Sequence, residues 1–592
     1  MSSNKILILE DKVQRRIPGY DHVFSFGYNP IADSFTHHYL SETELDRIYD
    51  EEFKATIQFL DNDSLKTIFS YRGVYLLWCF KKALFEFSYF IKHRYETFKQ
   101  VLNHFSTSDF YLSNADEIFE FPSLYTILKN SKLNGNPHVH FSTFDHSSHP
   151  EERSTKSTFL NLIWPSVIQF GDFKNAETAI FSDYEKSKNV LSKISALKPV
   201  LLTNSKAPRT LLRAVQNKSS LFQFVSNGTQ SYSDRTQCLI KQIKELKLFE
   251  HFELGELDGQ DLLQNELEHL FRTFLPKLFF EIDQMHRFFQ NASKLRNILI
   301  DEDVSITKNA FCQIAKQYNV KSYLECHGAL GHQIGLIPLT ADIIFMWGRA
   351  QKDKLAQWGC PEEKIVVTGC TKYAPYQSLN DDKVRLEICK QLNLDPNKKI
   401  ILIGFNSTRI NRGQFVLEAK VKQNADSILS AVHSILDEHP DYQAILKVHP
   451  GDDHIESYQQ WGKLSPNANK RVIEIFDSLL LAKASDLLVV YASTYAVDGF
   501  ALDRPVICFD DDSWKLLSEF KKYSIFSYTN RADELKSLIP NLLSNNDWRS
   551  KFWQDARKNC LNENGKQAAD IITDYMTEPH TLPSELAYER SK

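Results

Sequence analysis

The sequence predicts an α/β protein built on parallel sheets, and three observations indicate it. Short runs of β-branched and aliphatic residues alternate with amphipathic stretches of helical length along most of the chain. In the second half, the connections between these segments are only a few residues long. The composition is that of a globular protein, with 42% hydrophobic and 24% charged residues.

The first half of the chain shows this pattern loosely. Two long amphipathic segments predict helices, one over residues 73–105 and a helical region over residues 246–294. Apolar runs between turn residues predict strands over residues 5–10, 22–27, 55–61, 138–146, 178–184 and 199–205.

From residue 297 the alternation becomes regular and falls into two series. In the first we expect strands over 297–303, 321–328, 341–348 and 364–370, with helices over 306–319 and 350–359. In the second we expect strands over 398–407, 442–452, 471–476, 486–494 and 504–512, with helices over 425–440, 477–485 and 495–503.

A polar segment over residues 373–396 separates the two series, and a helical tail over residues 533–576 follows the second. We therefore expect a first domain over residues 1–375, with helical insertions, and a second over residues 385–592. Two such α/β series predict a pair of Rossmann-like domains that face each other across a cleft. In open parallel sheets, ligands bind outside the carboxyl ends of the strands.

Polar side chains follow the expected strands at these ends. Short hydroxyl side chains beside free backbone N–H groups favour phosphate, and arginines can clamp it. The alternatives, ordinary helix capping for the Ser-Thr pair and a strand-end turn for the Lys-x-His-Pro segment, remain open. The candidates for donor binding are Asn406, Ser407, Arg409, Lys447, His449, Pro450, Ser493, Thr494 and Asp498.

The segment "LKVHPGD", followed by "SDLLVVYASTYAVDGFALDRPVICFD", resembles the C-terminal half of bacterial surface-polymer transferases with the GT-B fold. The families are the CDP-glycerol glycerophosphotransferases and the capsule-type β-Kdo transferases, and some CMP-sialic acid transferases share the His-Pro and paired-hydroxyl features. The matching positions are Lys447, His449, Pro450, Asp486, Ser493, Thr494, Asp498, Arg504 and Pro505.

The same families carry a His-Gly turn in the N-terminal domain, which "ECHGALGHQIG" resembles at His327 and Gly328. Cys326 stands where the glycerol-phosphate enzymes commonly carry a tryptophan, and Ala329-Leu330 replaces their Thr-Pro pair. These departures weaken the polyol-phosphate interpretation more than the GT-B interpretation. The resemblance covers about residues 297–576.

The chemistry expected at this turn is removal of a proton from an acceptor hydroxyl. An imidazole that titrates near neutrality suits a general base, so His327 is the first candidate and Glu325 the second. Gly328 and Gly331 would let acceptor and donor approach the backbone. A zinc site would need three or four ligands within tetrahedral reach, and Cys326 and His327 are adjacent and would point to opposite faces of a strand, so no metal or other cofactor is expected. A glycine-permitted structural loop, with His327 packed, remains the alternative.

The bulk properties restrict the partners and the compartment. A net charge of −5 and the lack of a basic stripe disfavour nucleic acid. Nine scattered cysteines without a C-x-x-C pair predict reduced thiols and a cytoplasmic protein. The most hydrophobic segment, residues 74–91, is interrupted by charges and predicts a buried helix, with peripheral association with the inner membrane face left open.

The function expected from these features is sugar transfer from a nucleotide-activated donor to a glycan or glycolipid acceptor in surface polysaccharide synthesis. The resemblance favours a CMP-linked acid sugar such as Kdo or sialic acid. The alternatives are a CDP-glycerol-type polyol-phosphate transferase and a non-catalytic GT-B-like binding protein. A nucleotide-sugar epimerase ranks below these, because "YASTYAVDG" stands where a glycine-rich stretch would be expected.

Overall fold

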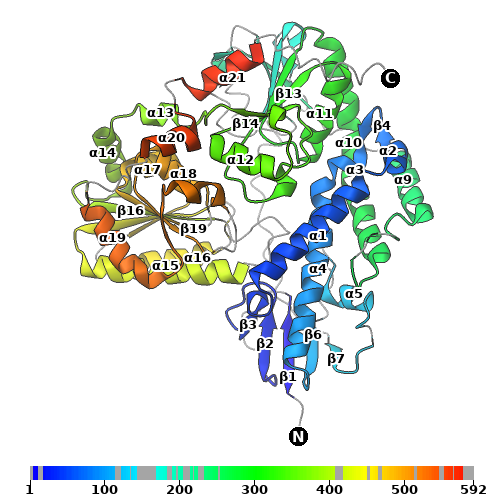
Figure 1. Cartoon of the computed structure of the whole chain (residues 1–592), viewed down its shortest axis with the longest axis horizontal. Helices are drawn as coiled ribbons and strands as arrows, with labels where there is room; N and C mark the ends of the chain where they lie inside the picture. Colours follow the sequence, from blue (N-terminus) through cyan, green and yellow to red (C-terminus); the bar gives the residue numbers. More distant parts are fainter. Residues whose placement is uncertain are drawn as a thin grey trace.

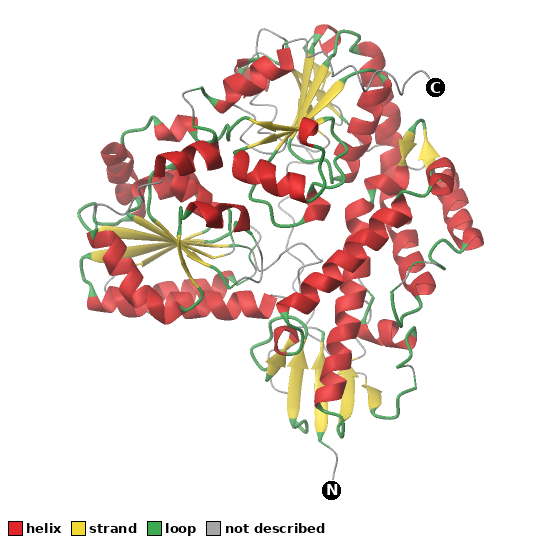
Figure 2. Ribbon diagram, in the orientation of Figure 1, coloured by secondary structure: helices red, strands yellow, loops and turns green. Residues whose placement is uncertain are grey.

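The structure is a computed structural model that describes residues 4–577, except for 11–17, 114–121, 134, 143–168, 172, 183–189, 192, 195–197, 204–213, 218, 225–231, 251, 253, 407–417, 450–451, 453, 465–469, 492, 512–515, 546–552 and 564–565. The described residues form three lobes, each built around its own sheet (Figures 1 and 2). The predicted α/β class with two parallel, Rossmann-like sheets is confirmed. The third sheet is an addition that the sequence pattern did not reveal.

The C-terminal lobe holds a six-stranded sheet in which every pairing is parallel. The order is β18-β17-β16-β19-β20-β21, so the chain starts in the middle and grows first to one side and then to the other. Helices cover both faces, which is why β16 is buried at every residue after its first. The strands are β16 (Lys399–Phe405), β17 (Tyr442–Lys447), β18 (Lys470–Ile473), β19 (Leu487–Tyr491), β20 (Val506–Phe509) and β21 (Ser527–Thr529).

The upper lobe of Figure 1 holds an eight-stranded sheet of order β15-β14-β13-β12-β9-β10-β11-β8. Its pairings are parallel except the one between β11 and β8. The strands are β8 (Gln169–Phe170), β9 (Thr178–Phe181), β10 (Val200–Thr203), β11 (Ser220–Gln223), β12 (Asn297–Ile300), β13 (Lys321–Glu325), β14 (Ile343–Met346) and β15 (Ile365–Val367).

The N-terminal lobe holds the additional, five-stranded sheet, again fully parallel, in the order β3-β2-β1-β6-β7. The domain expected over residues 1–375 therefore contains two separate sheets. The strands are β1 (Lys5–Leu9), β2 (His22–Ser25), β3 (Ser34–Phe35), β6 (Asp109–Ser113) and β7 (Val139–Ser142).

Two long helices, α1 (Glu42–Leu60) and α4 (Lys81–His104), run side by side from the N-terminal lobe toward the upper lobe (Figure 1). The strand predicted over 55–61 is wrong, because these residues end α1. Ser41 caps the helix, accepting from the Glu44 N–H at 3.3 Å while the Glu44 carboxylate accepts from the Ser41 N–H at 2.8 Å. Its buried positions recur every three or four residues, which is helical rather than strand spacing.

The last helices return to the eight-stranded sheet, as Figure 1 shows for α21 (Ala568–Thr577). Met576 and Ile572 share a buried cluster with Tyr323 and Phe345, and Asn297 donates to the Met576 carbonyl at 2.7 Å. The other helices are α2 (Asp63–Ile68), α3 (Leu76–Cys79), α5 (Leu124–Lys129), α9 (Ser233–Leu246), α10 (Gly259–Asn291), α11 (Ile306–Gln317), α12 (Arg349–Gln357), α13 (Ala374–Gln377), α14 (Asp381–Leu392), α15 (Glu418–Glu438), α16 (Ile455–Lys463), α17 (Ser478–Ala484), α18 (Tyr495–Ala501), α19 (Leu535–Ser544) and α20 (Trp553–Leu561), with β4 (Ser70–Tyr71) and β5 (Val74–Tyr75) forming a hairpin.

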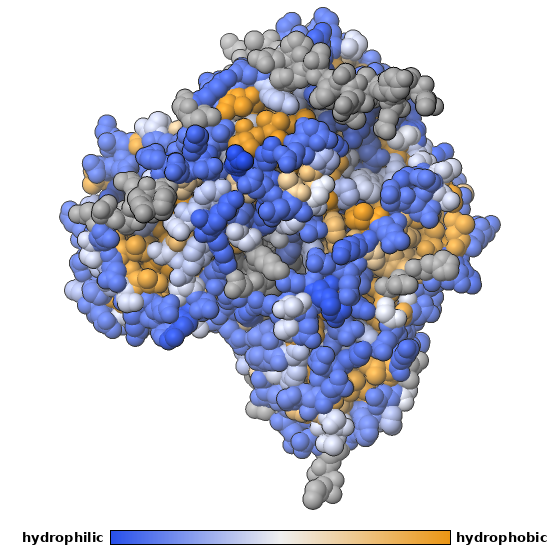
Figure 3. Space-filling model, in the orientation of Figure 1, coloured by the Kyte–Doolittle hydropathy of each residue, from blue (hydrophilic) through white to orange (hydrophobic). Residues whose placement is uncertain are grey.

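The face of the molecule shown in Figure 3 is mostly hydrophilic where it is coloured, with separate apolar patches. Among the described helices, none is long and apolar enough to cross a membrane. The segment predicted to be a buried helix, residues 74–91, forms the hairpin strand β5, α3 and the first half of α4, and it is largely buried. All nine cysteines are free thiols, and every one except Cys238 is buried.

Candidate functional site

A cavity of about 930 Å³ lies among strand ends of the two larger sheets and the helices α1 and α4. The eight-stranded sheet contributes His327, two residues after β13. The six-stranded sheet contributes residues that follow β16, β17 and β19: Asn406, His449, Ser493 and Thr494. Side chains that are far apart in the sequence thus face one solvent-filled space.

The six-stranded sheet presents its topological switch point to this cavity. Strands β16 and β19 are neighbours, yet the chain leaves them toward opposite edges of the sheet. Asn406 follows the first of these strands, and Ser493 and Thr494 follow the second. In open parallel sheets, this crevice is where ligands bind, because two loops separate there and leave room.

The turn that carries His327 is held rigidly on several sides. The Trp347 indole donates to the Cys326 carbonyl at 3.0 Å, and the Gln351 amide donates to the Gly328 carbonyl at 3.0 Å. The Leu330 N–H donates to the Glu519 carboxylate at 2.9 Å. His327 itself is exposed to the cavity. A fixed backbone with an exposed imidazole is what a positioned base requires.

The turn also touches the C-terminal lobe directly. The Ala329 N–H donates to the Thr494 hydroxyl at 3.3 Å, and a Cβ built on Gly328 would lie 3.3 Å from the same oxygen. A Cβ on Gly331 would meet Leu516 of the C-terminal lobe at 3.3 Å. The expectation was that these glycines admit the substrates. The structure shows a further reason for glycine here, because both residues lie where the two lobes approach each other closely.

His449 and Ser493 stand on the opposite wall. His449 is exposed to the cavity, and partial desolvation of its ring lowers the pKa of the imidazole below the ordinary value, with Asp452 opposing the shift and Lys447 adding to it. The ring is therefore neutral at physiological pH and can donate an N–H to an anion. The Ser493 hydroxyl accepts from the Tyr495 N–H at 3.3 Å, a local turn contact that leaves its own proton to donate.

Three of the candidate side chains that the structure describes do not line the cavity. Glu325 is buried and accepts from the Thr371 hydroxyl at 2.5 Å. The Lys447 ammonium donates to the carbonyls of Val448 and Glu474, at 2.8 and 3.0 Å. The Asp498 carboxylate contacts Lys372 and Tyr373 instead. Three further candidates, Ser407, Arg409 and Pro450, lie outside the described residues.

Asp498 connects the end of the first α/β series to the C-terminal lobe. Its carboxylate is buried, lies 2.6 Å from the Lys372 ammonium and accepts from the Tyr373 hydroxyl at 2.8 Å. Burial alone would lower the pKa of Lys372, but the carboxylate more than offsets this effect and raises it. Asp498 is a donor-binding candidate from the sequence, but these contacts favour a structural role for its carboxylate.

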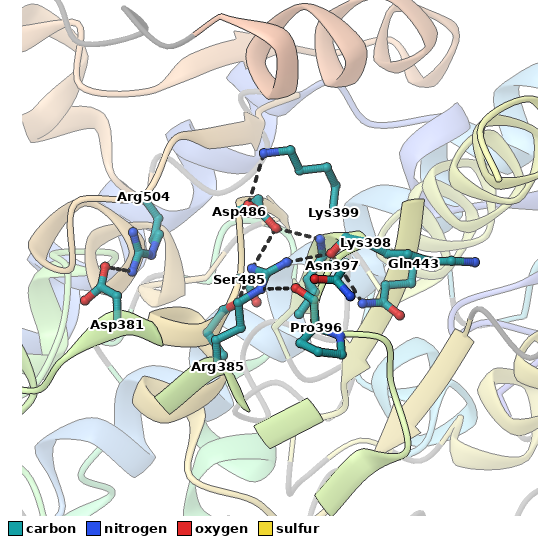
Figure 4. A network of polar contacts seen from close by, with 12 residues as sticks. Asp381, Arg385, Pro396, Asn397, Lys398, Lys399, Gln443, Ser485, Asp486 and Arg504 are labelled. Carbon is teal, nitrogen blue, oxygen red and sulfur yellow. Dashed lines mark hydrogen bonds and ion pairs between the residues drawn. The ribbon is translucent and has the colours of Figure 1, made fainter. Parts of the chain in front are cut away.

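Two other positions of the resembling motif have structural partners (Figure 4). Asp486 accepts from Arg385 of α14 at 2.9 Å and from the Ile400 N–H at 2.8 Å. Arg504 pairs with Asp381 at the start of the same helix. These contacts lie at the amino ends of β16 and β19, opposite the cavity. They attach the segment between the lobes to the six-stranded sheet.

The sequence did not reveal the third wall of the cavity, which α1 and α4 form. Residues at helical spacing on one face of each helix line it: Glu42, Leu45, Asp46, Tyr49 and Asp50 on α1, and Lys82, Phe85, Glu86 and Tyr89 on α4. The alternation of charged and aromatic residues on one face of α4 could have indicated this wall. The sequence analysis interprets the same segment only as a buried helix.

Among the described residues, no group of three or more His, Cys, Asp or Glu side chains is placed to hold a metal ion. Cys326, considered as a ligand from the sequence, is buried and its thiol donates to the Gly328 carbonyl at 3.2 Å.

No family model matches the chain, and no curated protein matches it either. Solved structures of similar shape include a UDP-GlcNAc 2-epimerase from Methanocaldococcus jannaschii, at 13% identity and a TM-score of 0.45, covering 68% of this chain and 99% of that one. A glycosyltransferase from Rickettsia africae is 13% identical with a TM-score of 0.41, covering 69% and 100%. Anabaena HepE, solved with UDP and glucose, is 12% identical with a TM-score of 0.40, covering 70% and 99%.

Proposed function

We propose that this protein is a GT-B transferase that moves a sugar from a nucleotide-activated donor to a glycan acceptor. The observation that carries the proposal is the pairing of His327 on one wall of the cavity with the switch-point residues on the other. An imidazole near an acceptor hydroxyl and hydrogen-bond donors near a leaving phosphate are the two requirements of such a transfer.

In this mechanism, His327 takes the proton of the acceptor hydroxyl as its oxygen forms a bond to the donor carbon. The bond from that carbon to the nucleotide phosphate breaks, and the phosphate leaves with its electron pair. His449, Asn406 and the hydroxyls of Ser493 and Thr494 donate hydrogen bonds to the growing negative charge. The turn contacts around His327 keep the base fixed before the substrates arrive.

The nucleotide is best identified by thermal protection. The purified full-length protein is heated with CMP, CDP, UDP or GDP and with donors linked to each, because a ligand that binds only the native state raises the unfolding midpoint. CMP-linked acid sugars are the first donors to test, with CDP-glycerol as the alternative. His449→Ala should lose the protection, whereas His327→Ala should keep it and lose transfer.

Protection without turnover for any donor would favour a non-catalytic binding protein. Protection by none of the nucleotides would refute the proposed function.

A further inference from the structure

The turn that carries His327 is attached to the C-terminal lobe as well as to its own lobe. Two of its carbonyls accept hydrogen bonds from side chains of the upper lobe. The next two N–H groups, those of Ala329 and Leu330, donate to the side chains of Thr494 and Glu519 in the C-terminal lobe, at 3.3 and 2.9 Å. The backbone beside His327 therefore takes its position from both lobes.

Glu519 belongs to a short 3₁₀ helix, Ser518–Tyr523, that follows the strands of the C-terminal lobe. One oxygen of its carboxylate accepts from the Leu330 N–H, and the other lies 3.0 Å from the ammonium of Lys354, on α12 of the upper lobe. Lys354 also donates to the Leu330 carbonyl at 2.5 Å and to the Ser518 hydroxyl at 2.8 Å. One ion pair between the lobes thus binds both the N–H and the carbonyl of Leu330.

This ion pair is almost fully withdrawn from water, with 12% of the Lys354 side chain and 0% of the Glu519 side chain exposed. Two charges buried in this way seldom stabilise a fold more than apolar side chains of similar size would. Their hydrogen bonds to the Leu330 backbone are charge-assisted, however, and such bonds are about twice as strong as neutral ones. The pair is therefore better suited to fixing the position of this backbone than to adding general stability.

We propose that Glu519 is a positioning residue for His327. By holding the Leu330 N–H from the C-terminal lobe, its carboxylate sets the imidazole against the acceptor hydroxyl only when the two lobes are in contact. The inference rests on the proposed function, because it takes His327 as the base. Without Glu519, the donor still binds at the switch point, but the base loses its fixed geometry, and a displacement of about 1 Å lowers a rate by about 10²-fold.

Hydrogen exchange of the full-length protein, with no ligand added, tests the contact itself. Glu519→Ala should speed amide exchange in the peptide over residues 326–335 roughly tenfold, because a buried N–H loses its acceptor. The matched control is Glu10→Ala in the N-terminal lobe. The Glu10 side chain is equally buried, pairs with Arg94 and accepts from the Leu124 N–H at 2.8 Å, outside the described lining of the cavity. It should leave exchange at the turn unchanged.

The kinetic test uses the CMP-, CDP-, UDP- or GDP-linked sugar that protects the wild type against unfolding, with release of free nucleotide, to water or to an added glycan, as the readout. Glu519→Ala should lower kcat about 10²-fold and leave the donor KM and the nucleotide protection unchanged. Glu519→Gln keeps an oxygen that can accept from the Leu330 N–H, so its rate should lie between these two. Because Glu519 acts through His327, the double variant Glu519→Ala/His327→Ala should be no slower than His327→Ala.

The inference is overturned if exchange at the turn is the same in Glu519→Ala and Glu10→Ala, or if the effects of Glu519→Ala and His327→Ala on the rate multiply. Loss of nucleotide protection in Glu519→Ala would overturn it too, because Glu519 would then contact the donor. If Glu519→Ala does not fold, Glu519→Gln is judged by the same criteria. A wild-type rate in His327→Ala would instead refute the proposed function.

Discussion

The five-stranded sheet at the N-terminus and the six-stranded sheet near the C-terminus are both parallel, and each grows outward from its first strand, β1 or β16. Their relation to the cavity differs. The six-stranded sheet lines it with residues that follow its strands, whereas from the N-terminal lobe the described lining residues come only from α1 and α4. One sheet places polar groups that follow its strands beside the cavity, and the lobe of the other contributes two helices that form a further wall.

The largest effect that would test this division is expected at His327. Replacing it by alanine should lower the transfer rate by about 10²- to 10⁴-fold, the usual contribution of a general base, and should leave nucleotide protection intact. Steady-state assays and thermal shifts measure the two properties separately. His138→Ala, an exposed histidine outside the cavity, is the control. An unchanged rate for His327→Ala would mean that the chemistry lies elsewhere.

The next effect concerns the contact that joins the two sheets of the site. Asp498→Asn removes the charge that balances the Lys372 ammonium, whose side chain is 24% exposed. Breaking such a pair should lower the free energy of unfolding by about 3 kcal/mol, measured in urea. The surface pair of Lys566 and Asp574 provides the control, because Asp574→Asn should cost less than about 1 kcal/mol. If Asp498→Asn and Asp574→Asn lower the free energy of unfolding equally, Asp498 does not have the structural role described.

A third prediction concerns the packing of α1 on α4. Burial raises the pKa of Glu52 to about 7, although Lys92 and Ser88 oppose the shift. Folding therefore favours the protonated form. The contribution of the protonated Glu52 carboxyl to the free energy of unfolding is fully present below pH 4.5 and is lost as the pH rises through 7. Glu52→Gln should stabilise the protein at about pH 8 by about 2 to 3 kcal/mol and have little effect near pH 4.

Urea denaturation at several pH values measures this dependence. Glu51→Gln, an exposed neighbour, should show no pH-dependent difference. If Glu52→Gln brings no gain at high pH, the carboxyl is not buried against α4 as described.

The smallest predicted effect tests the role of His449 in nucleotide binding by its pH dependence. Partial desolvation lowers the pKa of His449 in the free protein, and the negative charge of a bound phosphate should favour its protonated form. Nucleotide affinity should therefore rise, by up to about tenfold, as the pH falls below 6.5. His449→Gln should abolish this rise, whereas Asp46→Asn should preserve it. Titration calorimetry over a pH series would decide, and a rise that persists in His449→Gln would exclude His449 as the group responsible.

Much of the site could be predicted because strand ends in parallel sheets can be read from local sequence. Buried runs such as "ILIG" and "LLVVY" mark strands, and the polar residues after them must reach the sheet edge. Asn406, His449, Ser493 and Thr494 meet His327 at one cavity for this reason. Whether a nearby polar side chain points into the cavity or into a structural contact depends on tertiary neighbours that the sequence does not reveal.

Glu325 and Asp498 illustrate this limit. Glu325 lies two residues before His327 and Asp498 four residues after Thr494, both of which line the cavity. Thr371 and Lys372 nevertheless contact these carboxylates from a part of the chain that follows another strand. The five-stranded sheet escaped prediction for a related reason. Its strands are only two to five residues long, and α1 and α4 separate β3 from β6 in the sequence, so the strands predicted over 5–10, 22–27 and 138–146 did not indicate a sheet of their own. The run over 55–61, with the apolar content of a strand, belongs to the end of α1.

The return of the last helices to the eight-stranded sheet has a consequence for dissecting the protein. Gly348 lies under α20, where an added Cβ would come within 2.3 Å of the Asn559 carbonyl oxygen, and α21 covers Tyr323 and Phe345. The polypeptide therefore passes twice between the lobe of the eight-stranded sheet and the lobe of the six-stranded sheet. A single cut in the segment over 373–396 would leave the N-terminal fragment without the helices that cover its eight-stranded sheet. We therefore expect this fragment to be insoluble or poorly folded when it is expressed alone, unless residues 553–577 are supplied to it.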